Sequence, residues 1–112
     1  WNLAADKDNK PHTDNGGCSM CQGALTIEGN TVSRNLAYYV IAHASKFVPS
    51  GSVRIGSTPA GQITDVAFRT PQGKTALIVA NNSETDHSFS VEIHGRSFST
   101  TLNAGSVGTY VW

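Results

Sequence analysis

The sequence is poor in charge and has no long apolar run, and each shortage excludes a class of protein. Eight Lys and Arg residues balance eight Asp and Glu residues, so the formal charge is +0 and charged residues make up only 14% of the 112-residue chain. A nucleic-acid-binding module normally carries a basic excess on one face, which this balance does not provide. No apolar stretch approaches the roughly 18–20 residues that a membrane-spanning helix needs. We therefore expect no nucleic-acid partner and no membrane span.

The small and polar uncharged residues that are abundant in the sequence indicate a secreted protein. Glycine, serine, threonine and asparagine are abundant, a balance common among secreted all-β proteins, and the mean hydropathy is -0.22. The chain starts at Trp1 rather than at a methionine, which is typical of a processed product or an excised piece. We expect the protein to be secreted, in an extracellular or periplasmic location.

The hydrophobic pattern divides the chain into three zones. Residues 1–23 combine a short apolar start with a polar loop that holds both cysteines. Residues 35–48 predict a helix, because apolar side chains recur at three- and four-residue steps after Asn35, a plausible cap. In residues 51–112, apolar and polar residues alternate over short segments, and residues typical of turns separate these segments. This last pattern predicts an antiparallel β-sandwich or barrel.

The period-two zone predicts individual strands and their buried faces. The segment 75–80 is apolar throughout, as expected for a central strand covered on both faces. Alternation leads us to expect Phe68, Phe89 and Phe98 to point into the sandwich. The predicted strands are 52–55, 65–69, 75–80, 88–94, 97–102 and 107–112.

The two cysteines, Cys18 and Cys21, allow three interpretations. A zinc site would need His12 and His43 as further ligands, at a spacing that matches no established zinc finger. A thioredoxin-type redox pair needs a helix that starts at the motif, whereas glycines flank this one on both sides. A short structural disulfide is the simplest interpretation in a secreted protein and would make the loop rigid. We expect no metal site.

Short motifs in a fixed order carry a family resemblance over essentially the whole chain. They are Trp1-Asn-Leu-Ala, a Gly-Gly loop, Tyr38-Tyr39, His43-x-Ser-Lys-Phe-Val48, Pro49-x-Gly-x-x-Arg54-Ile55, Val66-Ala-Phe68, Thr70-Pro-x-Gly73 and Ser106-Val-x-Thr-Tyr-x-Trp112. Each motif is weak alone, but together they resemble the C-terminal end of glycoside hydrolase family 30 enzymes, a family that includes glucosylceramidases and β-1,6-glucanases.

The resemblance implies a domain organisation. Members of this family carry a (β/α)8 barrel fused to a β-sandwich. Residues 1–50 would then be the end of the catalytic barrel, with its last strand, the Cys-containing loop and its last helix. Residues 51–112 would be the C-terminal β-sandwich. Because barrel active sites lie at the C-terminal ends of the strands, Trp1 and the loop after it would face the sugar.

The resemblance also implies that the catalytic residues lie elsewhere. Retaining glycosidases use two carboxylates about 5–5.5 Å apart. In this family both are glutamates on the fourth and seventh barrel strands, which this sequence lacks. Its own glutamates, Glu28, Glu84 and Glu92, have the context of solvated surface residues, as do Asp6, Asp8 and Asp14. We expect no catalytic residue here, no cofactor, and no hydrolysis without a barrel in the same polypeptide or in a partner chain.

Trp1 and Asn2 are the candidate substrate-binding residues. A flat indole face packs against the C–H face of a pyranose, so Trp1 at a barrel-strand end would contact a β-glucoside or β-glucan, although burial between strand and helix is the plainer role for a tryptophan. We expect Trp112 to be an apolar plug against the sandwich instead. The family resemblance also implies a lysosomal location if the source is an animal.

A second function class is a free-standing carbohydrate-binding β-sandwich. Such a module needs exposed aromatics on one face, and among the strand aromatics only Tyr110 is expected to be exposed. His43, on the apolar stripe of the helix, is expected to be a hydrogen-bonded core histidine. Asn81-Asn-Ser83 matches an N-glycosylation acceptor in a predicted surface loop.

Overall fold

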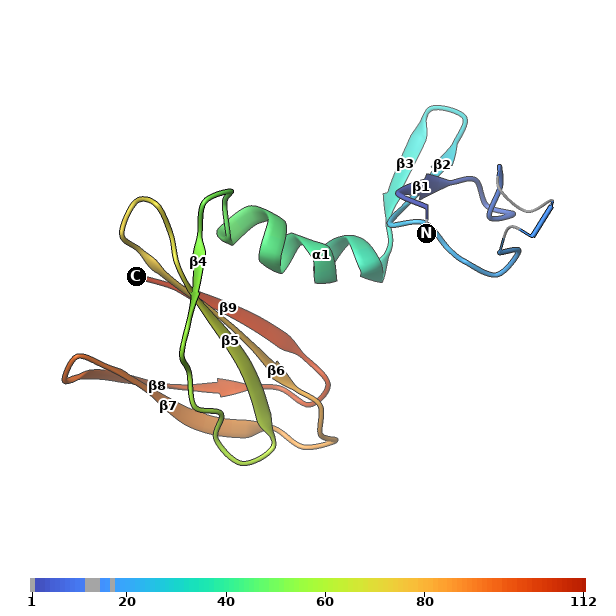
Figure 1. The fold of residues 1–112 in the computed structure, drawn as a ribbon. Coiled ribbons are helices and arrows are strands. Elements are labelled where there is room, and N and C mark those ends of the chain that lie inside the picture. Colours follow the sequence, from blue (N-terminus) through green and yellow to red (C-terminus); the bar gives the residue numbers. More distant parts are fainter. Residues whose placement is uncertain (1, 12–14, 17) are drawn as a thin grey trace. The chain divides into compact units, whose positions relative to one another are not determined.

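The computed structural model describes residues 2–11, 15–16 and 18–112. The chain divides into two compact units, Trp1–Ala42 and His43–Trp112. The division falls inside α1(Leu36–Phe47), the one helix of the described residues (Figure 1). The helix begins and ends within one residue of the range predicted from periodicity. Pro49 and Gly51 lie within four residues of its end, and neither favours continuing a helix.

The first unit contains a small three-stranded sheet. Its strands are β1(Ala4–Ala5), β2(Leu25–Glu28) and β3(Thr31–Arg34), in the order β1-β2-β3. β1 runs parallel to β2, whereas β2 and β3 form an antiparallel hairpin. The hairpin turns at Gly29, whose φ of 58° is a left-handed conformation that glycine adopts without strain. This sheet brings the end of the cysteine loop back beside the strand from which the loop departs.

Asn35 connects this sheet to the helix. Its backbone N–H donates to the Ala24 carbonyl at 2.9 Å. Its side-chain Nδ2 donates to the Gly23 carbonyl at 2.8 Å and to Thr26 Oγ1 at 2.9 Å. The side chain predicted to cap the helix therefore donates to β2 and to the residue before Ala24 instead.

The second unit is a β-sandwich of two antiparallel sheets. Four strands pair in the order β4-β5-β6-β9, and β7 pairs with β8 (Figure 1). The alternating segments were thus correctly predicted as strands, and the predicted fold class, mainly β with antiparallel sheets, is confirmed. The bounds are β4(Val53–Ile55), β5(Ile63–Arg69), β6(Thr75–Asn81), β7(His87–Ile93), β8(Arg96–Leu102) and β9(Val107–Val111).

The sandwich core lies between the two sheets. β6 is its centre, since Leu77 and Val79 are buried on the inner face while Ala76 is fully buried on the opposite face. Burial on both faces accounts for the continuous apolar run of β6. The buried cluster comprises Ile63, Ala67, Leu77, Val79 and Leu102, with Ile55, Phe89, Val91 and Tyr110 packed against it.

The inward prediction was right for Phe89 and wrong for Phe68. Phe89 packs against the core cluster, but the register pairs Phe68 with Arg54 and Ala76, on the face opposite to Ala67. β5 carries apolar residues on both faces, so alternation alone does not identify the inner one. Phe98 lies beside Tyr110 at a ring-centroid distance of 5.6 Å, yet it is 38% exposed.

Within the described residues, the structure contains no helix long and apolar enough to cross a membrane.

Candidate functional site

The loop that follows β1 starts with a turn built on Asp6. The Asp6 carboxylate accepts hydrogen bonds from the backbone N–H groups of Asp8, at 2.9 Å, and Lys10, at 2.8 Å. The Asp6 N–H donates to the Lys10 carbonyl at 3.0 Å, and the Asn9 N–H to the Asp6 carbonyl at 3.1 Å. The bond from Lys10 is the main cause that lowers the pKa of Asp6 from its ordinary value, because it favours the ionised form. The turn is thus best ordered while Asp6 is charged.

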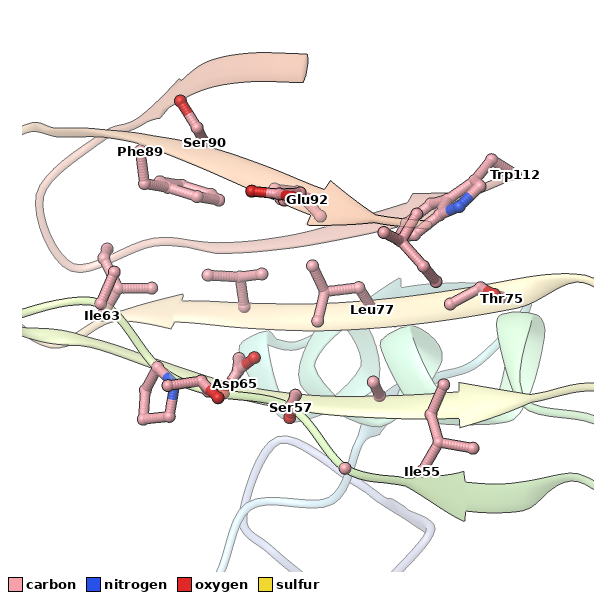
Figure 2. A pocket seen from close by; sticks show the side chains of 18 residues that line it. Ile55, Ser57, Ile63, Asp65, Thr75, Leu77, Phe89, Ser90, Glu92 and Trp112 are labelled. Carbon is pink, nitrogen blue, oxygen red and sulfur yellow. The ribbon is translucent and has the colours of Figure 1, made fainter. Parts of the chain in front are cut away.

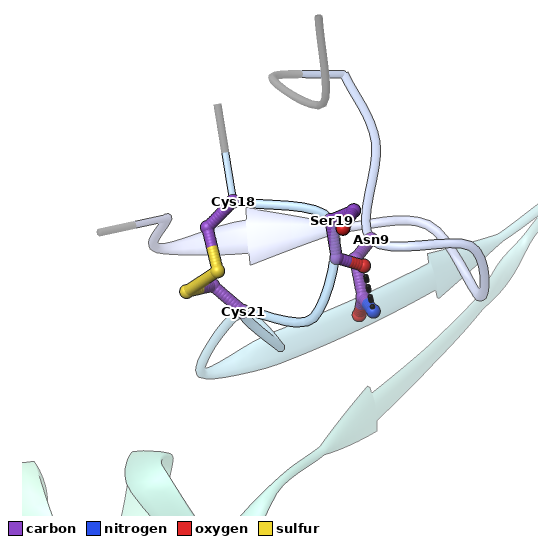
Figure 3. Close-up of a disulfide and its surroundings, with 4 residues drawn as sticks. All are labelled: Asn9, Cys18, Ser19 and Cys21. Carbon is purple, nitrogen blue, oxygen red and sulfur yellow. Dashed lines mark hydrogen bonds between the residues drawn. A yellow bond between two sulfur atoms is a disulfide. The ribbon is translucent and has the colours of Figure 1, made fainter. Parts of the chain in front are cut away.

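A disulfide closes the far end of the same loop. Cys18 and Cys21 are bonded, with their Cα atoms 5.3 Å apart, so four residues form a small ring (Figure 3). The Asn9 side chain donates from Nδ2 to the Ser19 carbonyl inside this ring at 3.0 Å. The Asp6 turn and the disulfide ring are therefore linked. The two thiols are bonded to each other rather than free to bind zinc. No helix starts at the motif, as a thioredoxin-type redox pair would need.

The end of the loop is held closely against β1. The Leu25 N–H donates to the Leu3 carbonyl at 2.9 Å. A Cβ atom on Gly23 would lie 2.9 Å from the Ala5 nitrogen and 2.9 Å from the Leu25 oxygen, so only glycine fits there. Both ends of the loop are thus fixed to one small sheet.

The predicted substrate-binding residues stand at the start of this arrangement. Asn2 is half-buried and comes directly before the β1 region. Trp1 lies outside the described residues, as do His12 and Asp14. Their proposed roles therefore stay predictions.

The acidic residues of the described part form no metal-binding cluster. Glu28, Glu84 and Glu92 are exposed, in agreement with their sequence context. No group of three or more His, Cys, Asp and Glu side chains comes together within residues 2–11, 15–16 and 18–112. Asp65 is half-buried on the inner face of β5, opposite Val79.

A cavity of 190 Å³ lies between the two sheets of the sandwich. Figure 2 shows Ile63, Leu77 and Phe89 lining it, with Trp112 towards one end. Its walls are mainly the apolar inner face of the sandwich, and Asp65 contributes a carboxylate. Sequence alternation predicts the inner face, but not how completely the two sheets fill the space between them.

Aromatic side chains line a second hollow between β8 and β9. Phe98 lies edge-on to Trp112, with ring centroids 5.8 Å apart, and tilted against Tyr110. Phe98 and Trp112 are 38% and 40% exposed, and Arg96 and Thr109 also line the 580 Å³ hollow. Trp112 therefore packs against the sandwich while keeping part of its indole in solvent.

His43 bonds to the outer side of the four-stranded sheet. Its Nδ1 lies 2.8 Å from Thr109 Oγ1 of β9, and the pair is partly buried. The helical histidine is hydrogen-bonded as predicted, but it is half-buried rather than in the core, since no residue of α1 is buried. This bond joins the C-terminal end of α1 to the sandwich within one unit.

The predicted glycosylation site at Asn81 is wrong for the folded chain. Asn81 is the last residue of β6 and only 1% exposed. Its Nδ2 donates to the carbonyls of Thr85, Leu102 and Asn103, and its Oδ1 accepts from Ser83. The amide nitrogen that a glycan would need is therefore buried and already bonded.

Comparison with known proteins identifies the sandwich. The family model described as the glycosyl hydrolase family 30 beta sandwich domain matches residues 51–110. The chain is 31% identical over 118 aligned positions to endo-1,6-beta-D-glucanase neg1 of Aspergillus fumigatus, covering 99% of this chain and 24% of that protein. It is 28% identical to mouse lysosomal acid glucosylceramidase, covering 100% of this chain and 22% of that protein.

A solved structure shares this fold over the whole chain. The endo-beta1,6-glucanase BT3312 matches with a TM-score of 0.85 at 37% identity, covering 100% of this chain and 26% of that one. The chain thus spans about a quarter of the length of the relatives that it matches.

Proposed function

The chain belongs to glycosyl hydrolase family 30, and from this premise we propose that it is the C-terminal portion of a retaining β-glycosidase. Its sandwich supports the catalytic barrel, and Trp1, Asn2 and the loop after them complete the sugar cleft. Residues 1–50 form the end of that barrel, and residues 51–112 form the sandwich. The observation that carries the proposal is that the whole chain matches about one quarter of the length of proteins named as endo-1,6-β-glucanases.

The uncovered apolar side chains of α1 support a barrel partner. Leu36 is 79% exposed, Tyr39 is 53% exposed and Val40 is 55% exposed. An amphipathic helix normally buries such a stripe, and an exposed one marks a contact surface. The rest of the barrel, in the same polypeptide or in a partner chain, supplies the cover.

The exposed glutamates support a catalytic pair outside this chain. Retaining hydrolysis needs an acid/base and a nucleophilic carboxylate about 5–5.5 Å apart. Glu28 and Glu92 belong to different compact units, and Glu84 lies in the exposed loop before β7. The two glutamates that perform the chemistry therefore lie on other strands of the barrel, and this chain alone is inactive.

The substrate is a β-glucoside or a β-glucan. Relatives named for endo-1,6-β-glucanase activity and for glucosylceramidase activity both align along the whole chain. A disulfide and a relative named as lysosomal support a location in the secretory pathway or beyond. No cofactor enters the proposed reaction, because carboxylates and water suffice.

Two measurements on the full-length protein test the proposal: the anomeric configuration of the released product, and the effect of Trp1→Ala on kcat/KM. Proton NMR of the first product released from a β-1,6-glucan should detect the β-anomer, as retention requires. Trp1→Ala should lower kcat/KM by about fivefold, in line with the ~1 kcal/mol typical of an aromatic contact. Release of the α-anomer would exclude the retaining mechanism, and an unchanged kcat/KM would remove Trp1 from the cleft.

The exposed aromatics between β8 and β9 favour one alternative, a carbohydrate-binding sandwich. Phe98 and Trp112 leave part of their rings in solvent beside Arg96, which is the arrangement that a sugar-binding face requires. Titration of the sandwich, residues 51–112, with laminarin, pustulan and cello-oligosaccharides distinguishes the two functions. Saturable binding that Trp112→Ala abolishes would establish the binding module, and the glycosidase proposal predicts none.

A further inference from the structure

The two outer faces of the sandwich differ in chemical character. On the β7–β8 sheet the six outward positions are all polar, and they are Ser88, Ser90, Glu92, Ser97, Ser99 and Thr101. Two pairs of hydroxyl groups bond across the strands at 2.8 Å, Ser88 with Thr101 and Ser90 with Ser99. We call this surface the hydroxyl face. An antiparallel sheet carries polar residues on the side that it turns to water, so the hydroxyl face has the composition of a solvent face.

The outer face of the four-stranded sheet has the opposite character. The register places Val66 of β5 beside Ile78 of β6, and Phe68 beside Ala76. β9 continues the second row with Val111 beside Ala76. We call these five residues the apolar outer face. Their residue types do not depend on how much of the protein surrounds the sheet, and apolar residues on both faces of a strand indicate that both faces are covered.

One side of the apolar outer face is covered within the sandwich unit itself. Ala76 is 0% exposed, Val111 is 40% exposed, and the other members lie between these values. The C-terminal end of α1 bonds to the same face, because His43 Nδ1 lies 2.8 Å from Thr109 Oγ1, and Thr109 pairs with Ile78. The cover therefore begins with α1 at β9 and is incomplete over the rest of the face.

We propose that the apolar outer face is the surface of the sandwich on which the catalytic barrel packs, and that the hydroxyl face points away from the barrel. This inference rests on the proposed function, in which α1 is the last helix of that barrel. Barrel elements beside α1 continue the cover that His43 begins at β9. The chain spans about a quarter of the length of its relatives, so ample polypeptide is available for this contact.

The energetics of burial favour this face over the other. Aliphatic and aromatic side chains such as Val66 and Phe68 gain free energy when they leave water. The hydroxyl groups of Ser90 and Ser99 already bond to each other, and burial would remove their remaining water without supplying new partners. A barrel that packs on the apolar outer face therefore avoids the cost that packing on the hydroxyl face would carry.

The test places a photo-cross-linking amino acid at single positions of the full-length protein. Phe68→p-benzoylphenylalanine keeps an aromatic ring on the apolar outer face, and irradiation should link it to a peptide outside residues 1–112. Ser99→p-benzoylphenylalanine is the matched control on the hydroxyl face, where links to such peptides should be lost. Peptide mass spectrometry identifies the partner in each case.

Val111→p-benzoylphenylalanine provides a second position on the apolar outer face if the Phe68 variant does not fold. Links to peptides outside residues 1–112 from position 99, but not from positions 68 and 111, would overturn this inference alone in a protein that cleaves β-1,6-glucan. A cross-linked product of doubled mass from position 68 would also overturn it, because a second copy would then cover the face. A full-length protein that cleaves no β-glucoside would overturn the proposed function, whichever peptide position 68 reaches.

Discussion

At the scale of single residues, two polar side chains organise the segments around them. Asn81 is buried at the end of β6 and donates to the carbonyls of Thr85, of Leu102 at the end of β8, and of Asn103. Asp6 performs a similar task in solvent, where its carboxylate holds two backbone N–H groups. Both act by satisfying backbone groups that no strand or helix pairs.

Asn81→Ala should destabilise the sandwich by about 3 kcal/mol, because it leaves several buried backbone groups without a partner. Asn82→Ala is the matched control, since that exposed side chain makes a single 3.4 Å contact with Thr64, and it should cost less than about 0.5 kcal/mol. Hydrogen exchange of the β6 and β9 peptides in the full-length protein measures both. Equal exchange rates in the two variants would contradict the role of Asn81.

Protonation of Asp6 should loosen the start of the loop. The pKa of Asp6 lies below 3.8 in the folded protein, mainly because of the Lys10 N–H. The stabilisation is therefore complete above pH 3.8 and is lost as the pH falls through the folded pKa. NMR of lysine-labelled protein should detect an upfield shift of the Lys10 amide proton in that acidic range. A transition midpoint above 3.8 would contradict the ionised turn.

Which polar residues matter is only partly readable from the sequence. The hydrogen-bonded state of His43 follows from its place on an apolar stripe. The burial of Asn81 does not, because Asn81-Asn-Ser83 has the composition of an exposed loop, and its partners Leu102 and Asn103 are distant along the chain. Local pattern identifies a residue's own element but not the segment that folds over it.

At the scale of elements, α1 is joined to structure at both of its ends. Asn35 ties its start to Gly23 and Thr26, and His43 ties its C-terminal end to Thr109. These bonds lie within separate compact units. The helix is therefore well held at both ends while its exposed apolar stripe remains available to a partner.

The His43–Thr109 bond should contribute about 1 kcal/mol of coupling energy, as partly buried hydrogen bonds do. A double-mutant cycle of His43→Ala and Thr109→Val, read from the unfolding of the sandwich, measures it. The matched control is the Ser90–Ser99 pair, which has the same 2.8 Å separation but is exposed, and its coupling should be below about 0.5 kcal/mol. Equal coupling in the two pairs would show that burial adds nothing.

The sequence predicts most elements well and their faces less well. The helix follows from apolar residues that recur every three to four positions. The six sandwich strands follow from apolar residues that recur at every second position. The face of β5 was misassigned at Phe68, because apolar residues stand on both faces of β5 and alternation alone does not identify the inner face. The parallel pairing of β1 with β2 joins segments separated by a long loop, and no local pattern encodes it.

At the scale of the whole molecule, this chain is a family 30 sandwich together with a segment that leaves apolar surface uncovered. The family resemblance was readable from the order of short motifs, and the domain match over residues 51–110 confirms it. The arrangement of the Cys18–Cys21 ring, Asn9 and the Asp6 turn was not readable. It depends on side-chain to backbone bonds that have no sequence signature.

The isolated chain should associate or precipitate when it is produced alone. The exposed Leu36, Tyr39 and Val40 lack the cover that a barrel would provide. Size-exclusion chromatography with light scattering should detect dimers or larger species, and Leu36→Ser with Val40→Ser should restore a monomer. A monomeric wild-type chain with cooperative melting would mean that the stripe needs no partner.

The measurement that tests the central claim most directly is the location of the covalent intermediate. Retaining enzymes form a glycosyl-enzyme ester on a carboxylate nucleophile. An activated 2-deoxy-2-fluoro-β-glucoside should trap this ester in the full-length protein, and peptide mass spectrometry then identifies the labelled residue. We predict a glutamate outside residues 1–112. A label on Glu28, Glu84 or Glu92 would contradict the account.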